Sequence, residues 1–318
     1  MSEQSIPVVS LKDYTDGTPA QRDAFIATVG EALVDLGFFA LEDHGVPQTL
    51  VDQAYDCTRR LFDLDAVAKE RYVIPGCRGQ RGMTRFGMEH AKDSPAADLK
   101  EFWQIGRDLP TDHPRYRAER QNPWPSELPN FAPTMLDLFA RLDTVACSLL
   151  EACSMNIGEP ANVLADMARG GDTILRLIHY PPVPSDREPA AVRAAAHEDI
   201  NLLTILCEAT SGGLELLQRD GNWRAVHALH GQFVVDTGDM IQHCTNGFYK
   251  STTHRVVNPD NSRDRRFSMP FFVHPRPEIN LEPLPSCVAL TGGEPKFPAL
   301  TADQFLQQRL AEIGLGDA

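Results

Sequence analysis

The sequence predicts an α+β fold that is mainly β, in which helices at both ends buttress a central β core. Between residues 173 and 275, short apolar runs alternate with turn signals such as Gly212-Gly213 and Asp220-Gly221. Many short strands separated by close turns are typical of a β-sandwich or barrel. The apolar residues before this stretch recur at helical spacing, and a last amphipathic helix is predicted over 301–313.

The N-terminal half is predicted to alternate strands and helices before the core begins. Apolar residues at three- and four-residue steps, such as Met135, Phe139 and Leu142, mark the longest helix. Residues 74–130 carry many glycines, prolines and charges with little periodicity, which predicts a long loop region that covers another part of the molecule. The predicted elements are, in order, strand 6–11, helix 23–36, strand 38–41, helix 50–62 and helix 135–153.

Composition excludes several classes of function. The 318 residues carry 30 Lys+Arg and 44 Asp+Glu, a formal net charge of −14. A chain with this deficit of cations lacks the basic face that binding to nucleic acid or to an anionic membrane requires. No apolar stretch is long enough to cross a bilayer. We therefore expect a globular protein that binds neither nucleic acid nor a membrane.

The cysteines predict a reducing compartment. The seven cysteines are odd in number, scattered along the chain and never spaced as Cys-x-x-Cys. This pattern disfavours both a disulfide framework and a cysteine-rich zinc site. The N-terminus has no basic segment followed by an apolar one, so the chain is predicted to be cytoplasmic.

One histidine is followed two residues later by a carboxylate, in His197-Glu198-Asp199. In an extended segment, residues i and i+2 face the same side, so His197 and Asp199 can converge on one metal ion. A β core with several turns can return His254 to their side. Two histidines and one carboxylate form the facial triad of non-haem Fe(II) oxygenases, although the same donors also accept zinc, nickel or copper.

A second pair of residues follows His254 in an apolar, strand-like run. Arg266 and Ser268 share one face of this run. A buried guanidinium is costly unless it meets an anion, and it binds a carboxylate through two parallel hydrogen bonds. The pair therefore predicts an anion-binding site, the alternative being a structural ion pair with a nearby acidic side chain.

With these motifs, the chain resembles the isopenicillin N synthase-like branch of the Fe(II)- and 2-oxoglutarate-dependent oxygenases over nearly its whole length. The pieces that carry the resemblance are Ile6–Leu11, Gly37–Phe39, Asp43–Pro47, Tyr180–Pro182, His197–Asp199, Gly212–Leu216, Phe233–Asp239, Asn246-Gly247, Tyr249–Ser251, His254–Asn258 and Arg266–Ser268. The resemblance implies a double-stranded β-helix, or jelly-roll, core with buttressing N-terminal and C-terminal helices. It implies a single oxygenase unit over 1–318, with an N-terminal helical and loop region over 1–130, the core over 173–275 and a C-terminal helix over 300–314.

The resemblance also implies roles for individual residues. His197, Asp199 and His254 would bind Fe(II), while Arg266 and Ser268 would hold the distal carboxylate of 2-oxoglutarate. Tyr180 matches a tyrosine that contacts this cosubstrate in the plant enzymes, but Ile178 and His179 depart from the Asn-Tyr that precedes it there. The implied reaction consumes O₂ and 2-oxoglutarate, oxidises a C–H bond of a small molecule, by hydroxylation in the first instance, and releases succinate and CO₂.

Candidate substrate-binding residues lie mainly in the long loop region. Arg78, Arg81 and Arg85 concentrate positive charge in an acidic protein, which indicates either a solvated loop or recognition of an acidic substrate. The other candidates are Phe102, Trp103 and His243, each of which could instead be a core residue.

Three alternatives remain open at this point. In an isopenicillin N synthase-type oxidase, Arg266 holds the substrate and no 2-oxoglutarate is used. The fold could instead serve a non-catalytic small-molecule binding protein. The donor set of two histidines and one aspartate would also suit a zinc hydrolase.

Overall fold

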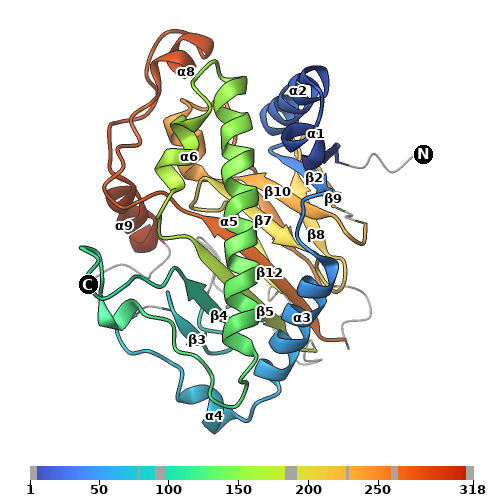
Figure 1. The fold of residues 1–318 in the computed structure, drawn as a ribbon, viewed down its shortest axis with the longest axis vertical. Helices are drawn as coiled ribbons and strands as arrows, with labels where there is room; N and C mark the ends of the chain where they lie inside the picture. The colour runs from blue at the N-terminus through green and yellow to red at the C-terminus, as the bar shows by residue number, and fades with distance from the viewer. Residues whose placement is uncertain are drawn as a thin grey trace.

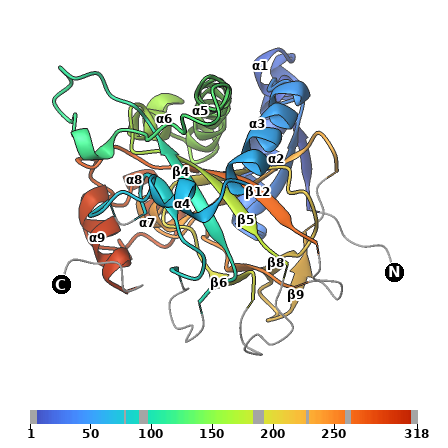
Figure 2. The ribbon, with the colours of Figure 1, turned by 90° about the horizontal axis from the view of Figure 1, so that it is seen from below.

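The computed structural model describes residues 6–77, 79–89, 97–182, 192–226, 229–258 and 264–312. Two β-sheets face each other, and helices cover the outer face of the larger sheet (Figures 1 and 2). The larger sheet has the strand order β1 (Val8–Ser10), β2 (Phe38–Glu42), β10 (Phe233–Thr237), β7 (Leu203–Cys207), β12 (Arg266–Val273), β5 (Ile174–Tyr180), β4 (Glu101–Gly106) and β3 (Gly82–Thr84). The smaller sheet has the order β6 (Ala194–His197), β11 (His254–Val256), β8 (Leu214–Leu217) and β9 (Trp223–Ala225).

The long helix α5 (Phe131–Asn156) crosses the outer face of the larger sheet, as Figure 1 shows. Its apolar side packs on the sheet, with the Phe139 and Phe271 rings 5.0 Å apart in an edge-to-face contact. The helix predicted over 135–153 is confirmed, and the observed helix extends beyond both of these ends. The other helices are α1 (Leu11–Thr15), α2 (Pro19–Asp35), α3 (Gln48–Phe62), α4 (Ala66–Glu70), α6 (Asn162–Ala168), α7 (Asp239–Cys244), α8 (Pro285–Leu290) and α9 (Ala302–Glu312).

Local signals explain where α2 begins and ends. The Thr18 side chain accepts a hydrogen bond from the Gln21 backbone N–H, and the Gln21 side chain accepts one from the Thr18 backbone N–H. This capping box satisfies two backbone donors, and Pro19 fits the first helical turn. Gly37 follows the helix with φ +72°, and a Cβ there would lie 2.3 Å from Thr252 Oγ1. Glycine is therefore required at this turn into β2.

The predicted loop region over 74–130 is wrong in part. Residues Glu101–Gly106 form β4, which pairs antiparallel with β5, and Gly82–Thr84 form β3 at the edge of the larger sheet. All six residues of β4 are buried. A strand that is buried on both faces shows no alternation of apolar and polar residues, so periodicity does not reveal it. The short helices α1, α4, α6, α7 and α8 are likewise not predicted by the sequence.

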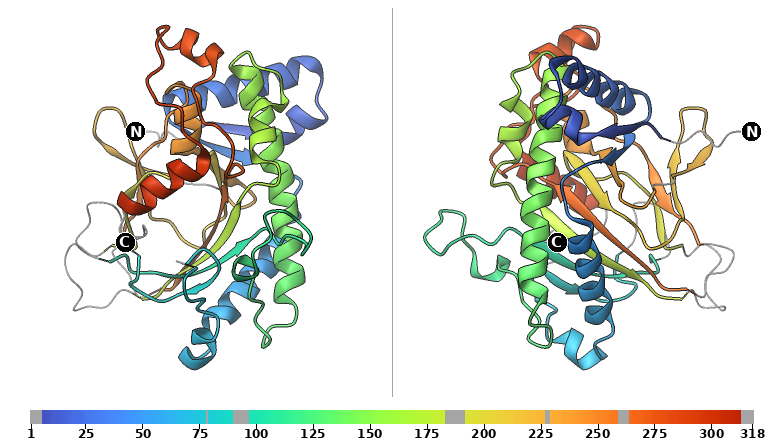
Figure 3. Two further views of the ribbon diagram at one scale, coloured as in Figure 1. Left: turned by 90° about the vertical axis from the view of Figure 1, so that its left-hand side faces the viewer. Right: turned by 45° about the vertical axis from the view of Figure 1, so that its right-hand side comes forward.

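Strands from the N-terminal part and from the core share the larger sheet. Strand β2 pairs antiparallel with β10, and β4 pairs with β5. The C-terminal helix α9, red in Figure 3, confirms the helix predicted over 301–313. No helix in the described ranges has the length and apolar character needed to cross a membrane.

Candidate metal and cosubstrate site

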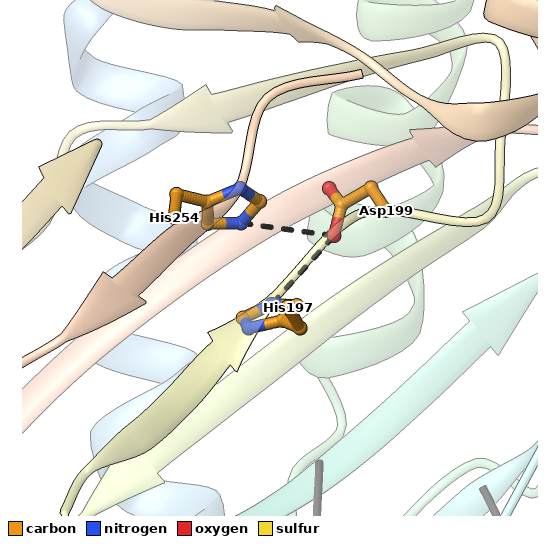
Figure 4. A group of neighbouring side chains, drawn as sticks. All are labelled: His197, Asp199 and His254. Carbon is orange, nitrogen blue, oxygen red and sulfur yellow. Dashed lines mark ion pairs between the residues drawn. The ribbon is translucent and has the colours of Figure 1, made fainter. Parts of the chain in front are cut away.

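The three predicted metal ligands meet between the two sheets (Figure 4). His197 ends β6 and His254 begins β11, and the pairing of these strands places the two residues opposite each other. Asp199 follows His197 by two residues. Its Oδ1 lies 3.7 Å from His197 Nε2 and 3.8 Å from His254 Nε2. Three ligand atoms within 4.8 Å of one another can hold one metal ion.

Backbone carbonyls orient both imidazoles. The Nδ1 of His197 lies 2.7 Å from Ala195 O, and the Nδ1 of His254 lies 3.1 Å from Thr252 O. A carbonyl only accepts hydrogen bonds, so each Nδ1 carries the proton and each Nε2 keeps a free lone pair. Burial, followed by the nearby His254, lowers the pKa of His197 to about 4. The ring is therefore neutral at physiological pH, as a metal ligand must be.

A hydrogen-bond chain holds the carboxylate of Asp199. The Thr204 hydroxyl donates to Asp199 Oδ2, which leaves Oδ1 toward the histidines. The Asn201 amide in turn donates to Thr204 Oγ1 at 2.9 Å. Support of this kind fixes the rotamer of a ligating carboxylate. Asp236 lies close by, and burial together with the charge of Asp199 raises the pKa of its carboxyl well above the usual value.

Arg266 and Ser268 face the same cavity from the larger sheet. Arg266 is 1% exposed, its Nη1 donates to Ser268 Oγ at 3.2 Å, and its Nε donates to Ser211 O at 3.1 Å. Tyr180 lies opposite Arg266 on β5, with its ring centroid 4.9 Å from the guanidinium carbon. Among the described residues, Arg266 forms no ion pair with an acidic side chain. A buried guanidinium in this state fits a carboxylate ligand better than a structural ion pair.

Ile178 and His179, the two residues that depart from the plant pattern, face opposite sides of β5. Ile178 faces the cavity beside Phe102 and Tyr180. His179 points toward the helices, where its ring stacks on Phe267 and its Nδ1 lies 2.8 Å from Glu101 Oε1. The cavity wall next to Tyr180 is therefore apolar at this position.

Comparison with known proteins decides the family. Residues 6–127 match the family described as non-haem dioxygenase in morphine synthesis N-terminal, and residues 171–275 match the 2OG-Fe(II) oxygenase superfamily. The 2-oxoglutarate-dependent dioxygenase caaD of Aspergillus niger is 30% identical over 85% of this chain and 84% of its own length. The chain belongs to the Fe(II)- and 2-oxoglutarate-dependent oxygenases.

Solved structures agree with this assignment. A 2OG-Fe(II) oxygenase family protein from Caulobacter crescentus superposes with a TM-score of 0.86 at 37% identity, covering 97% of this chain and 99% of that one. A full-length Neurospora crassa protein in complex with alpha-KG and thymine superposes with a TM-score of 0.85 at 26% identity, covering 96% of both chains. The predicted double-stranded β-helix core is confirmed. The protein is an oxygenase that uses Fe(II), 2-oxoglutarate and O₂.

The oxygenase has a cavity of about 1230 Å³ between its sheets. The triad, Arg266, Ser268 and Tyr180 all line it, and so does α9 through residues such as Leu306 and Arg309. A cavity of this size accommodates a cosubstrate and a small-molecule substrate together.

The predicted substrate residues divide into those that line this cavity and those that do not. Phe102 lines it, but the adjacent Trp103 points to the other side of β4 and packs in the core against Tyr72 and Phe131. His243 on α7 also lies away from the cavity, with its Nε2 2.7 Å from Pro298 O and its ring between Phe297 and Phe305.

The three arginines of the loop have different surroundings. Arg78 lies outside the described residues. Arg81 lines the cavity and is buried, donating from Nε to Arg120 O at 3.0 Å and from Nη1 to Gln80 O at 2.7 Å. Arg85 also borders the cavity, but it is half exposed and pairs with Glu70.

A charged group beside β4 and β5 was missed from the sequence. Lys100 Nζ lies 2.8 Å from Asp98 Oδ2 and 3.0 Å from Glu89 Oε1, and Arg176 Nη1 lies 3.2 Å from Glu89 Oε1. Lys100, Glu89 and Arg176 line the cavity, and Lys100 is near enough to His197 to help lower its pKa. Single charged residues give no signal of burial in the sequence, whether in the predicted loop region or in the core, so only the pairing of β4 with β5 reveals this group.

Proposed function

We propose that this oxygenase hydroxylates a C–H bond of a small molecule that carries an acidic group. His197, Asp199 and His254 would hold the Fe(II), and Arg266, Ser268 and Tyr180 would hold 2-oxoglutarate. The observation that carries the assignment is the convergence of two neutral imidazoles and one fixed carboxylate beside a buried guanidinium with no ion-pair partner among the described residues.

When bound, the iron and its cosubstrate supply the oxidising power, with O₂ consumed and succinate and CO₂ released. The protein residues position the reactants and exclude water. Arg266 fixes one end of 2-oxoglutarate by a charge-assisted hydrogen bond, with Ser268 holding the guanidinium in place. The Nδ1 atoms of the two histidines keep their protons, which they donate in hydrogen bonds to backbone carbonyls, so the Nε2 ligand atoms stay unprotonated.

A surplus of positive charge along one cavity wall supports an acidic substrate. Asp172 is paired with Arg115 at 3.1 Å and Arg120 at 3.6 Å, and the buried Arg81 lies near this same aspartate. Asp108 is also near Arg81, so two carboxylates meet three guanidiniums here, and Arg81 and Arg120 are the two guanidiniums that line the cavity. Arg176 also lines the cavity; its charge is paired with Glu89 at 3.2 Å, and its guanidinium carbon lies 4.2 and 5.2 Å from the ring centroids of Phe102 and Phe272. Cations fixed in a cavity attract an anionic ligand and orient it.

The whole chain is proposed to act as one oxygenase unit, with the region 1–130, the core 173–275 and the C-terminal helix 300–314 contributing to the same site. The pairing of β4 with β5 supports this, because Phe102 and Lys100 reach the cavity from the first region. We further propose a cytoplasmic location, which the seven free cysteines support.

The test is a substrate screen with purified protein, Fe(II), 2-oxoglutarate and O₂. Small organic acids are compared with neutral analogues, and both succinate release and a product heavier by one oxygen atom are measured. The expected result is acid-dependent succinate formation that is lost in His197→Ala. The matched control is His230→Ala, since the His230 side chain is 77% exposed and pairs with Glu208 near the surface.

Each alternative has its own outcome in this screen. Product formed without 2-oxoglutarate would indicate an oxidase in which Arg266 holds the substrate. Turnover without O₂ would indicate a hydrolase, and saturable ligand binding without product would indicate a binding protein. Stimulation by neutral analogues alone would overturn the acidic substrate while leaving the oxygenase assignment intact.

A further inference from the structure

Arg193 is a buried cation that the site as described does not use. It directly precedes β6, the strand that carries His197, and it is 1% exposed. Its Nη2 donates to Asp264 O at 2.8 Å. Its Nε and Nη1 are buried without any hydrogen-bond partner among the described residues. Buried donors of a charged group are almost always satisfied, so two unsatisfied ones require an explanation.

The surroundings of Arg193 point to the cosubstrate end of the cavity. Burial and then the charge of Arg266 lower the pKa of the Arg193 guanidinium, and Tyr180 and Asp264 oppose this shift. Arg193 thus hydrogen-bonds to a carbonyl two positions before Arg266, and it is in electrostatic reach of Arg266 and Tyr180, two of the three residues assigned to 2-oxoglutarate. Neither arginine has an acidic ion-pair partner among the described residues. Two such cations repel each other, and an anion between or beside them removes that cost.

We propose that Arg193 is a positioning residue that makes this subsite selective for a 2-oxo acid with a distal carboxylate. The inference rests on the proposed role of Arg266 in holding that carboxylate. Arg193 does not line the cavity, so it acts from behind Arg266, adding a second positive charge and bracing the start of β12 through the Asp264 carbonyl. The bound carboxylate supplies a negative charge beside two guanidiniums that form no ion pair among the described residues.

The test compares two ligands that differ only in the distal carboxylate. 2-Oxoglutarate and 2-oxopentanoate are titrated anaerobically into the Fe(II) protein, and the visible charge-transfer band of the chelate reports binding. In Arg193→Gln, the dissociation constant of 2-oxoglutarate is expected to rise roughly tenfold, the loss expected when one fixed charge near a buried anion is removed. That of 2-oxopentanoate is expected to change less than about twofold. Arg193→Lys keeps the charge and is expected to stay within about threefold of the wild type for both ligands.

The possible outcomes distinguish a failure of the role of Arg193 from a failure of the proposed role of Arg266. Equal weakening of both ligands in Arg193→Gln would show a merely structural role and overturn the proposal. Arg266→Gln serves as the reference: if it weakens 2-oxoglutarate but Arg193→Gln does not, only the role of Arg193 fails. If neither variant changes 2-oxoglutarate binding, the assignment of Arg266 fails as well. Should the glutamine variant not fold, the lysine variant decides, because a tenfold loss of preference for 2-oxoglutarate with the charge retained also overturns the proposal.

Discussion

Replacing Glu89 with glutamine is expected to destabilise the protein at neutral pH. Glu89 Oε1 lies 3.0 Å from Lys100 Nζ and 3.2 Å from Arg176 Nη1, and its side chain is only 20% exposed. Burial alone would raise the pKa of this carboxyl, but Arg176 and Lys100 together lower it to about 2 from the ordinary 4.5. That difference corresponds to roughly 3 kcal/mol of folding free energy at neutral pH.

The sign of the pH dependence follows from the lowered pKa. A carboxyl with a depressed pKa in the folded state stabilises it above the unfolded pKa, and this contribution is lost as the pH falls from about 4.5 toward 2. The gap between wild type and Glu89→Gln is therefore expected to be largest at pH 7 and to narrow below pH 4.5. This difference in the free energy of unfolding is measured by urea unfolding of the metal-free protein, monitored by tryptophan fluorescence.

A matched control shows how much the loss of an exposed ion pair changes the free energy of unfolding. Glu278 pairs with Arg276 at the surface, where its side chain is 60% exposed. Glu278→Gln is expected to change the free energy of unfolding by less than about 0.5 kcal/mol, because exposed ion pairs contribute little. Equal stability of Glu89→Gln and wild type at pH 7, or a difference that stays constant with pH, would refute the reasoning.

Three further predictions concern the support of the site and the core. Asp98→Ala removes the carboxylate that accepts the Ala195 N–H at 3.0 Å, and Ala195 O orients His197, so Fe(II) affinity measured by competition with a chelator is expected to fall about tenfold. Thr204→Val removes the hydroxyl that holds Asp199, and a similar loss is expected in the same assay; unchanged affinity would contradict it. Trp103→Ala is expected to lower the free energy of unfolding by about 3–5 kcal/mol in denaturant titrations while leaving 2-oxoglutarate affinity within about twofold.

The convergence of His197, Asp199 and His254 could be predicted because the geometry of this candidate metal site is mostly local. Histidine and aspartate two positions apart share a face of any extended segment, and the structure needs only one strand pairing to add His254. The same rule correctly placed Arg266 and Ser268 on one face of β12. The rule could not decide whether Phe102 or Trp103 lines the cavity. Neighbouring residues of a strand face opposite sides, and both side chains are buried.

The charged group beside β4 and β5 could not be predicted from the sequence, for a different reason. Lys100, Glu89 and Arg176 come from segments that are separated in the sequence, and each reads as an ordinary surface residue. Their burial becomes favourable only when they meet, because every charge then has an opposite partner. Sequence patterns record apolar periodicity, whereas mutual compensation of charges depends on the tertiary pairing of strands.

The alternation along β5 and β12 explains how one sheet serves both the core and the site. On β5, Arg176, Ile178 and Tyr180 line the cavity, while the leucines at 175 and 177 belong to the core beneath the helices. On β12 the cavity side begins with Arg266 and Ser268, and the phenylalanines at 267 and 271 pack toward α3 and α5. A shift of either strand by one residue would bury the arginines under the helices and expose apolar core residues to the cavity. The register that builds the core is thus the same register that points Arg266 into the cavity lined by His197, Asp199 and His254.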